Sequence, residues 1–526
     1  MKKSLSPFTS PEHSALLKGI RRGIEKESLR VTPEGQLANT SHPTALGSTL
    51  TNPFITTDYS EALLEFITPP LDSASAVLQT LDNIHRFTYR HIDDQLLWVN
   101  SMPCVLGRDA DIPVARYGSS NIGKMKTLYR EGLGHRYGRL MQTIAGIHYN
   151  WSLPDECWAL LQQHAQDTRP LKDFKTERYL ALIRNFKRHF WLLLYLFGAA
   201  PAVCRSFVAG RAHGLVPFGR DDHSLHMPYS TSLRMGDLGY QSDAQASLIV
   251  CYNDLRSYVN NLRGALTKPY PAYEQIGLRD RAGNYLQLST NLLQIENEFY
   301  SAIRPKRTTQ GNETPLKALW ERGVEYVEVR CIDLNPLLPV GIDAAQIHFL
   351  DSFLLHCLLS DSPPATAQEY RNILENQRRV VYRGRDPALT LIDGKDDVSL
   401  RAWAIKLLSE VAPVAALLDT AHGGNAYGTA VASAGQRVTN PELIPAARIL
   451  AQMAESGSTY FQTALGHASQ HREYFLDTPL DPAIAEEYAA LAAESLAEQR
   501  ALEAADTLSF DQFLANYYAQ YDFDMT

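Results

Sequence analysis

The sequence lacks the cysteine patterns that mark zinc-binding and disulfide-rich proteins. Its 526 residues contain no pair with the spacing Cys-x-x-Cys. Without such a pair we expect neither a zinc site nor a disulfide framework, and the reducing cytosol is the simplest compartment. Six cysteines are scattered along the chain, at Cys104, Cys157, Cys204, Cys251, Cys331 and Cys357.

The sequence also lacks a basic excess, a long apolar run and internal repeats. Its net charge is −8 and its pI is about 6.1, which argues against non-specific binding to nucleic acid. The longest apolar run, 190–203, spans about fourteen residues and includes Pro201, whereas a membrane-spanning helix needs roughly 20. The first residues, Met-Lys-Lys-Ser-Leu-Ser-Pro-Phe, show no apolar core of a secretory signal. We therefore expect a cytoplasmic protein with neither a nucleic-acid nor a membrane partner.

What the sequence contains is a mixture of predicted strands and helices, with 45% hydrophobic and 21% charged residues. Alternating and helical periodicities predict strands at 23–31, 62–68, 144–153, 286–293 and 325–334, and helices at 77–87 and 179–198. After residue 343 the pattern turns mostly helical, at 345–359, 400–420, 446–463 and 482–505. This order predicts an α+β fold with an antiparallel or mixed sheet. We expect a core at 1–345 and a mainly helical region at 346–526 that packs on it.

Loop and surface signals complete this prediction. Gly, Pro and Asp residues predict loops at 210–222, 268–271, 304–315 and 361–365, and we expect the loops at 210–222 and 304–315 to cover the site. The Ala/Glu-rich stretch 482–505 is expected to be a surface helix that packs Ile484, Tyr488 and Leu491 on the body. A helix that binds another protein is the alternative.

The segment Val324 to Arg330, V-E-Y-V-E-V-R, has the strongest functional signal. It alternates with period 2, so Glu328 and Arg330 point to one face of a strand. Charges flanked by valines are costly to bury unless each has a partner. A bound metal and a bound phosphate would be such partners.

Three other predicted strands have the same design. Glu25 and Glu27 share a face of the first strand, Glu65 lies between Leu64 and Phe66 in the second, and His148 and Asn150 share the polar face of the third. Taken alone, the glutamates also fit a solvated strand edge, and His148 also fits a histidine with a purely structural role.

If these strands share a sheet, their carboxylates converge and repel one another. Divalent cations relieve such repulsion, and this oxygen-rich set favours Mg²⁺, with Mn²⁺ as the substitute that also accepts a histidine. Mg²⁺ beside an arginine is typical of phosphoryl-transfer sites, where both stabilise the negative charge of phosphate groups.

The segment Gly118–Met125 matches the phosphate-binding pattern G-x-x-x-x-G-K but has Met125 where Ser or Thr would hold Mg²⁺. We therefore do not expect a P-loop. Lys124, Lys126 and Arg130 remain candidates for contacts with phosphate from a loop or a helix start.

A series of segments resembles glutamate–cysteine ligases of the proteobacterial type. The match runs from about Leu17 to Asp506, is dense to residue 345 and is loose afterwards. The segments are G-I-R-R-G-I-E-K-E-S-L-R-V, I-T-T-D-Y-S-E-A-L-L-E-F-I-T-P, K-T-L-Y-R-E-G-L, R-Y-G-R-L-M-Q-T-I-A-G-I-H-Y-N, P-Y-S-T-S-L-R-M-G-D-L-G-Y, L-Q-I-E-N-E-F-Y, I-R-P-K-R and E-Y-V-E-V-R.

The resemblance implies a glutamine synthetase-like antiparallel sheet, curved into a funnel and surrounded by helices. It implies that ATP hydrolysis drives amide formation between the γ-carboxylate of glutamate and the α-amine of cysteine, through γ-glutamyl phosphate, as the first step of glutathione synthesis. It further implies a monomer, feedback inhibition by glutathione and a separate glutathione synthetase.

The resemblance also implies roles for residues at matching positions. Arg330 would contact the transferred phosphoryl group, Arg234 the glutamate or acyl phosphate, and Asn150 the nucleotide or metal site. The metal ligands would be Glu25, Glu27, Glu65, His148 and Glu328. The cysteine pocket would be lined by Tyr59, Tyr129, Leu133, Gln142, Tyr240 and Tyr300, although position 59 can be Phe in relatives.

Two alternatives stay open at this point. The first keeps the ligase chemistry but changes the accepting amine, because small changes in a tyrosine-lined pocket would admit other amino acids or amines. The second is a catalytically inactive relative with a binding or regulatory role. Its signature would be the loss of a metal ligand or of Arg330, and all of these residues are present. The group that takes the amine proton is not visible in the sequence, and Asp58 is one candidate.

Overall fold

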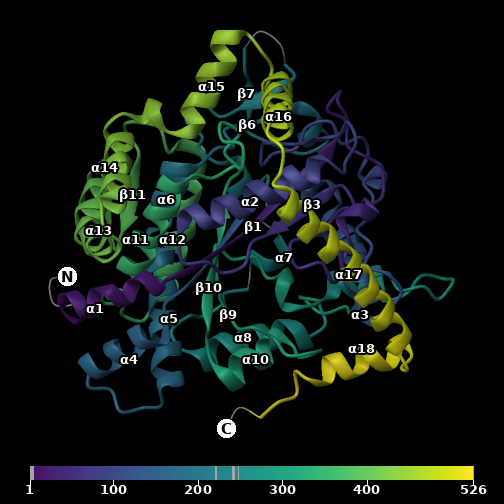
Figure 1. Ribbon diagram of the computed structural model, residues 1–526, viewed down its shortest axis with the longest axis horizontal. Helices are drawn as coiled ribbons and strands as arrows, with labels where there is room; N and C mark the ends of the chain where they lie inside the picture. Colours follow the sequence, from purple (N-terminus) through teal and green to yellow (C-terminus); the bar gives the residue numbers. More distant parts are fainter. Residues whose placement is uncertain (1–4, 220–221, 240–242, 247, 525–526) are drawn as a thin grey trace.

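A computed structural model describes residues 5–219, 222–239, 243–246 and 248–524 (Figure 1). Its centre is an antiparallel sheet with the strand order β2-β3-β1-β5-β10-β9, and β4 pairs with the far end of β1. The fold is therefore α+β with an antiparallel sheet, as predicted. The strands of this sheet are β1 (Arg21–Val31), β2 (Ile55–Thr57), β3 (Leu63–Ile67), β4 (Leu96–Leu97), β5 (Ile147–Ser152), β9 (Ile303–Lys306) and β10 (Tyr326–Ile332).

Helices surround the sheet and make up most of the chain after residue 343. The α-helices are α1 (Pro11–Ala15), α2 (Ala74–Tyr89), α3 (Asn121–Tyr137), α4 (Asp155–His164), α5 (Leu171–His189), α6 (Trp191–Phe197), α7 (Asp243–Ala246), α8 (Leu255–Thr267), α9 (Pro271–Ile276), α10 (Pro315–Arg322), α11 (Ala344–Leu359), α12 (Ala367–Arg383), α13 (Leu400–His422), α14 (Ala426–Thr439), α15 (Pro445–Ser456), α16 (Tyr460–Asp477), α17 (Pro482–Ala505) and α18 (Phe510–Ala519). The remaining strands form two small sheets, from β6 (Ala202–Cys204), β7 (Val216–Pro217) and β8 (Ser224–His226), and from β11 (Thr390–Asp393) and β12 (Asp396–Ser399).

The back face of the central sheet is apolar and covered by helices α2, α5 and α6, and α11 contacts it through Asp351. Tyr149, Trp151, Val327 and Val329 alternate onto this face and are buried. Because side chains of a strand alternate between the two faces, burying these residues turns their polar neighbours to the front. Packing of the back face therefore fixes which residues reach the site.

A buried ion pair ties the sheet to α11. The Arg22 guanidinium on β1 lies 2.9 Å from Asp351 Oδ2 on α11, and neither side chain is exposed. The Tyr149 hydroxyl on β5 donates to Asp351 Oδ1 at 2.7 Å. This contact joins the strand-rich core to the helical region, and the boundary at residue 345 stays a prediction.

The long helix α17 packs on the body of the protein, as predicted for 482–505. Tyr488 is buried, and its ring lies 5.4 Å from the rings of Phe54 and Phe87. Ile484 and Leu491 are partly buried against the same core. None of the helices in the described ranges has both the length and the hydrophobicity that crossing a membrane requires.

Several sequence predictions were wrong in detail. The expected strand at 286–293 is irregular. Its backbone N–H groups at Leu286, Leu292 and Leu293 donate to carbonyl oxygens in or just after helices α8 and α9 rather than to a neighbouring strand. The expected helix at 179–198 is divided between α5 and α6 at Phe190, and a hairpin interrupts the helical region at 390–399. Residues 303–306, predicted mostly as loop, form the edge strand β9, where Pro305 is tolerated because one side of an edge strand needs no ladder hydrogen bond.

The cysteine prediction also needs correction. Cys104 and Cys204 form a disulfide across 100 residues of sequence, and the other four cysteines are free. Strand β6 carries Cys204 to the segment that holds Cys104. Cysteines this far apart have no characteristic spacing in the sequence. The absence of a Cys-x-x-Cys pair therefore could not exclude this disulfide.

Candidate active site

A cleft of about 870 Å³ opens on the front face of the sheet. Its floor carries polar side chains from four neighbouring strands, whose register brings them together. Glu25 on β1 pairs with His148 on β5, and Glu27 on β1 pairs with Glu65 on β3. Glu328 on β10 pairs with Asn150 on β5. The five residues predicted to hold a metal therefore lie on one face and line one cleft.

Distances within this acidic cluster are short enough for a shared ion. Glu25, Glu65 and His148 each offer a ligand atom within 4.8 Å of the others. His148 Nδ1 is 3.0 Å from Glu25 Oε2 and 3.9 Å from Glu328 Oε1, and His148 Nε2 is 4.0 Å from Glu27 Oε1.

Burial and neighbouring charges shift the pKa values of the carboxylates in this cluster in opposite directions. Burial, together with the Asp58 carboxylate, raises the pKa of Glu27 to about 8. Burial, Glu25 and Asp58 raise the pKa of Glu65 well above its usual value. Burial alone would also raise the pKa of Glu328, but Lys306, Arg330 and a nearby histidine hold it well below its usual range. A cation near Glu27 and Glu65 would let both ionise.

Asp58 is a site residue whose place the sequence did not reveal. It follows β2 and lines the cleft near Glu27 and Glu65. The sequence suggested it only as a proton acceptor, because a residue in a turn has no strand face that periodicity can assign. The structure adds its carboxylate to the acidic cluster.

Cations border the cluster on the β9–β10 side. Arg330 Nη1 lies 3.2 Å from Glu328 Oε2 and 3.4 Å from His148 Nδ1, so it shares the front face as predicted. Lys306 Nζ on β9 lies 3.3 Å from Glu328 Oε1, and Arg304 is the cross-strand neighbour of Glu328. Sequence reasoning missed Lys306 and Arg304, because I-R-P-K is too short and too charged to show a strand period.

Arg234 lies beneath this cluster and is almost fully buried. Its Nη2 donates to the carbonyl oxygen of Arg330 at 3.1 Å, and its Nη1 lies 3.7 Å from Asp333 Oδ1. A Cβ at Gly146 would collide with the Arg234 guanidinium, so a glycine is needed there for this close approach. Arg234 thus supports the loop before β5 and the strand that carries Arg330.

The predicted nucleotide-binding residues are only partly brought together. Lys126 and Arg130 on α3 line the cleft, whereas Lys124 is exposed and lies outside its lining. Positions 126 and 130 are one turn apart, while 124 and 126 are separated by about 200° around the helix axis. Asn150 Nδ2 donates to Glu25 Oε1 at 2.8 Å, so it contacts the acidic cluster.

Most residues of the predicted acceptor pocket line the same cleft. Tyr240 lies outside the described residues. Tyr59 is 1% exposed, and its hydroxyl has no hydrogen-bond partner among the residues that the structure describes, so it remains available to a ligand. Five of the six predicted residues line the cleft here, namely Tyr59, Tyr129, Leu133, Gln142 and Tyr300.

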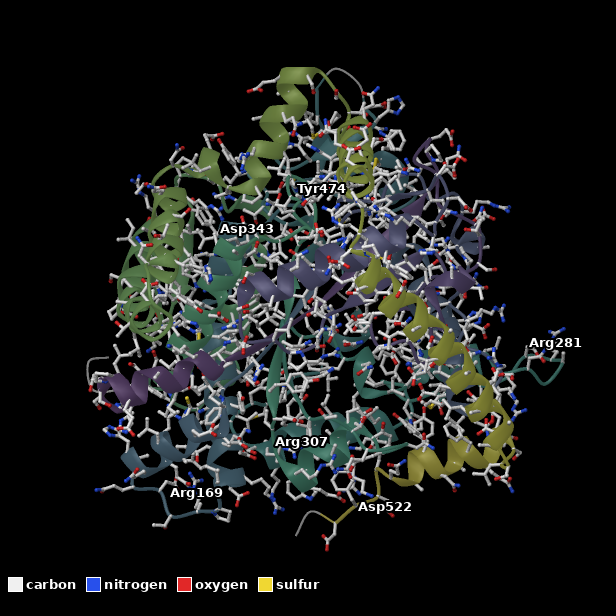
Figure 2. The ribbon with its side chains drawn as sticks, viewed as in Figure 1. Arg169, Arg281, Arg307, Asp343, Tyr474 and Asp522 are labelled. Atoms are coloured by element: carbon white, nitrogen blue, oxygen red, sulfur yellow. A yellow bond between two sulfur atoms is a disulfide. The ribbon has the colours of Figure 1, made fainter. Side chains whose placement is uncertain are left out.

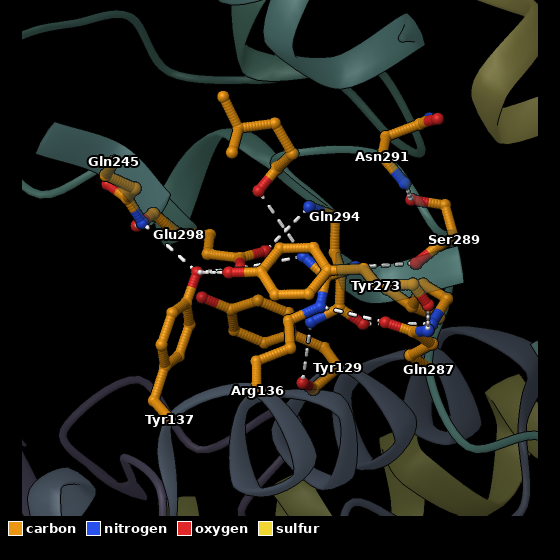
Figure 3. A network of polar contacts seen from close by, with 12 residues as sticks. Tyr129, Arg136, Tyr137, Gln245, Tyr273, Gln287, Ser289, Asn291, Gln294 and Glu298 are labelled. Atoms are coloured by element: carbon orange, nitrogen blue, oxygen red, sulfur yellow. Dashed lines mark hydrogen bonds and ion pairs between the residues drawn. The ribbon is translucent and has the colours of Figure 1, made fainter. Parts of the chain in front are cut away.

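A buried polar network supports the cleft beside Tyr129 (Figure 3). Glu298 Oε1 accepts from Arg136 Nη1 at 2.9 Å and from the Tyr137 hydroxyl at 2.7 Å. Glu298 Oε2 accepts from the Gln294 backbone at 2.6 Å, and the Gln294 amide donates to the Tyr129 carbonyl at 3.2 Å. The network therefore fixes α3 against segment 294–298.

Comparisons with known proteins all indicate the same family. The sequence profile described as glutamate-cysteine ligase matches residues 5–380. A glutamate–cysteine ligase from Alcanivorax borkumensis is 53% identical over 98% of this chain and 99% of its own length. One from Saccharophagus degradans is 51% identical over 97% of this chain and 96% of its own.

A solved structure matches the whole fold as well. The crystal structure of a glutamate–cysteine ligase from Francisella tularensis in complex with AMP has a TM-score of 0.89 and 36% identity. The superposition covers 95% of this chain and 97% of that one. With family profile, full-length relatives and fold in agreement, the chain belongs to the glutamate–cysteine ligase family and is an enzyme of the ligase class.

Proposed function

We propose that this chain uses ATP to join the γ-carboxylate of glutamate to the α-amine of cysteine, through γ-glutamyl phosphate. The products are γ-glutamylcysteine, ADP and phosphate. The observation that carries the proposal is the convergence of Glu25, Glu27, Glu65 and Glu328 with Arg330 in one cleft. The AMP in the Francisella tularensis structure supports the use of an adenine nucleotide.

The donor set of the cluster fits Mg²⁺, with Mn²⁺ as a substitute. Carboxylate oxygens predominate, and a single imidazole is compatible with either ion. The buried Asn150 Oδ1 lies beside Glu25, accepts no hydrogen bond within the described part of the chain, and is a further oxygen at the site. Bound Mg²⁺ would neutralise nucleotide phosphates. Its proposed ligands are Glu25, Glu27, Glu65, His148 and Glu328.

In the first step the γ-carboxylate of glutamate attacks the γ-phosphorus of ATP and ADP leaves. A carboxylate is a poor electrophile, and phosphorylation gives it a leaving group. The Arg330 guanidinium lies beside Glu328 and stabilises charge on the phosphoryl group during its transfer. Lys126 and Arg130, both on α3, bind phosphate oxygens. Most of the rate enhancement comes from positioning and charge neutralisation.

In the second step the neutral amine of cysteine attacks the acyl carbon of γ-glutamyl phosphate and phosphate leaves. Tyr59, Tyr129, Leu133, Gln142 and Tyr300 line the cleft and form the pocket for the cysteine. Their buried surfaces exclude water, which would otherwise hydrolyse the acyl phosphate.

The direct experiment supplies purified protein with ATP, Mg²⁺, glutamate and cysteine. We expect equal amounts of ADP and γ-glutamylcysteine, and far less ADP when cysteine is omitted. A ranked series of amines tests the alternative acceptor, and a marked preference for an amine other than cysteine would replace our assignment. Failure to form ADP and γ-glutamylcysteine would contradict the proposal. The same assay with added glutathione measures feedback inhibition.

Replacing Arg330 by lysine is expected to lower kcat roughly 10- to 100-fold. The ammonium keeps the charge but not the planar fork, and losing one charged hydrogen bond in the transition state costs about 1.5–3 kcal/mol. Steady-state kinetics measure the change, and Arg169→Lys on the exposed surface is the matched control. An unchanged kcat would exclude Arg330 from the phosphoryl-transfer step.

Metal binding is expected to strengthen as the pH rises from 6 to 8. Without metal, the raised pKa of Glu27, about 8, keeps this carboxyl protonated at neutral pH. A cation must displace that proton, so each proton released makes the apparent Mg²⁺ affinity rise about tenfold per pH unit below this pKa. Calorimetry in buffers of different ionisation enthalpy measures the release. Glu27→Gln should flatten the dependence, and a flat dependence in the unaltered protein would contradict the role of Glu27.

A further inference from the structure

Helix α17 runs over the surface of the protein from α2 to the start of α3 (Figures 1 and 2). None of its residues 482–505, all of which the structure describes, lines the cleft. The side chains that it turns to the body recur every three or four residues and so share one face. Tyr488 and Ala492 form the buried apolar half of this face. Its polar half, Ser495, Gln499 and Glu503, contacts two segments that lead into the cleft.

The first of these segments, residues 47–52, comes just before β2. Ser495 Oγ accepts from the Ser48 backbone N–H at 2.9 Å, and Gln499 Oε1 accepts from the Ser48 hydroxyl at 2.5 Å. Strand β2 then leads directly to Asp58, which lines the cleft beside the acidic cluster. The middle of α17 therefore holds the segment from which this wall of the cleft starts.

The second segment is the start of α3. Glu503 Oε1 accepts from the Ser119 backbone N–H at 2.7 Å, and the carboxylate of Asp506, just past the end of α17, accepts from the Asn121 backbone N–H. The hydrogen bond from Ser119 holds the pKa of Glu503 below its usual value. Gln499 Nε2 donates to the same Glu503 oxygen at 3.0 Å, which links the contacts at the two segments.

These contacts explain why Gly118–Met125 resembles a phosphate-binding loop. In such a loop, backbone N–H groups at the start of a helix bind a phosphate, and the helix dipole favours the negative charge. Here two carboxylates of the same chain accept from those groups. A Cβ at Gly118, whose φ is +78° to +82° in type and is printed as +82°, would collide with Glu503, and one at Gly123 would collide with the Tyr117 carbonyl oxygen. Both glycines of the pattern thus allow close packing around internal anions.

Helix α3 carries groups of the active site along much of its length. Tyr129 and Leu133 belong to the predicted acceptor pocket, and Lys126 and Arg130 are the candidate phosphate ligands. Arg130 Nε also donates to the carbonyl oxygen of Asp58, so the two walls that α17 contacts meet at the cleft. A shift of the first turn of α3 would therefore displace several groups of the site at once.

We propose that α17 positions the two walls of the active site, with Glu503 and Asp506 as the positioning residues for α3. The proposal rests on the ligation proposed above and gives the C-terminal helical region a role in it. Both residues act through α3, because neither of them lines the cleft. A misplacement of about 1 Å can cost roughly 100-fold in rate, so a smaller shift of α3 is expected to be visible in the kinetics.

The test removes both carboxylates from the full chain, in the variant Glu503→Ala with Asp506→Ala. We expect kcat/KM for cysteine to fall about tenfold, as for a displacement of less than 1 Å. The affinity for Mn²⁺, measured by calorimetry, should not change, because the proposed metal ligands lie on the sheet. Hydrogen exchange of the backbone amides in 118–126, followed by mass spectrometry, should become faster, and this measurement does not depend on activity.

Asp419→Ala is the matched control. The Asp419 carboxylate, near the end of α13, accepts from the backbone N–H groups of Tyr427 and Gly428 at the start of α14, both at 2.9 Å, and α14 contributes nothing to the cleft lining. We expect this variant to lower the midpoint of thermal unfolding at least as much as the double variant, with normal kcat/KM. Glu503→Gln with Asp506→Asn keeps an acceptor oxygen at each position and should recover most of kcat/KM.

Unchanged kcat/KM in the double alanine variant would overturn the proposal, and so would an equal loss in Asp419→Ala. A parallel loss of Mn²⁺ affinity would indicate damage to the whole site and would also overturn it. If the double variant does not fold, Glu503→Ala alone is measured in the same way. If the unaltered chain formed no γ-glutamylcysteine, the proposed function would fail, whereas unchanged hydrogen exchange in 118–126 would overturn the role of α17 by itself.

Discussion

Glu328→Gln is expected to lower kcat about 1000-fold or more, with little change in the stability of the fold. Glu328 is almost fully buried, and Lys306 and Arg330 keep it ionised, so it is the carboxylate of the cluster held most firmly in its charged form. The amide of glutamine has the same shape but no charge to hold a divalent cation. Removing one preorganised charge partner from a transition state costs about 100- to 1000-fold in kcat, and Glu328 also orients Arg330.

Stopped assays of γ-glutamylcysteine formation across a range of Mg²⁺ concentrations measure this effect. The matched control is Glu321→Gln on the exposed side of α10, where the carboxylate pairs with Lys317. The midpoint of thermal unfolding should stay close to that of the unaltered chain, because the substitution also removes repulsion among carboxylates. A Glu328→Gln enzyme with normal turnover would exclude this residue from the metal site.

Asp351→Ala is expected to destabilise the protein by about 3–5 kcal/mol without altering any group in the cleft. The substitution leaves the buried Arg22 guanidinium without its counter-ion, and breaking one partner of a buried ion pair costs this much. The Tyr149 hydroxyl loses its acceptor as well. Because Arg22 and Tyr149 lie on the strands that carry Glu25 and His148, thermal inactivation should follow unfolding closely.

Denaturant unfolding measured by circular dichroism and by tryptophan fluorescence quantifies this loss. Replacing both partners, as in Arg22→Met with Asp351→Leu, should restore much of the stability, since apolar groups of similar volume need no counter-ion. Glu177→Ala, which removes an exposed partner of Arg169, should change the unfolding free energy by less than about 1 kcal/mol. Equal stabilities of Asp351→Ala and the unaltered chain would show that this ion pair does not hold α11 to the sheet.

The front face of the sheet could be predicted from sequence because strand periodicity assigns faces without knowledge of the fold. Once Tyr149 and Val329 are recognised as buried, His148 and Glu328 must point the other way. Periodicity could not tell which strands are neighbours. The register pairs Glu25 with His148 and Glu27 with Glu65, and it follows from packing of the whole back face.

Contacts between distant segments could not be predicted from a single sequence. Lys306 was missed because β9 is short, charged and contains Pro305, so it resembles a loop. The Cys104–Cys204 disulfide and the bonds from Gln520 to segment 309–315 join residues 100 to 208 positions apart. No local spacing encodes such pairs, and these contacts are visible only in the assembled fold.

The central claim is that the γ-carboxylate of glutamate is phosphorylated in this cleft before the amine attacks. Glutamate labelled with ¹⁸O in the γ-carboxylate, supplied with ATP, Mg²⁺ and cysteine, tests it directly. Attack by the carboxylate on phosphorus predicts that the released phosphate carries one ¹⁸O atom for each γ-glutamylcysteine formed, as seen by mass spectrometry. Phosphate free of ¹⁸O in a reaction that still makes γ-glutamylcysteine would contradict the acyl phosphate and the account built on it.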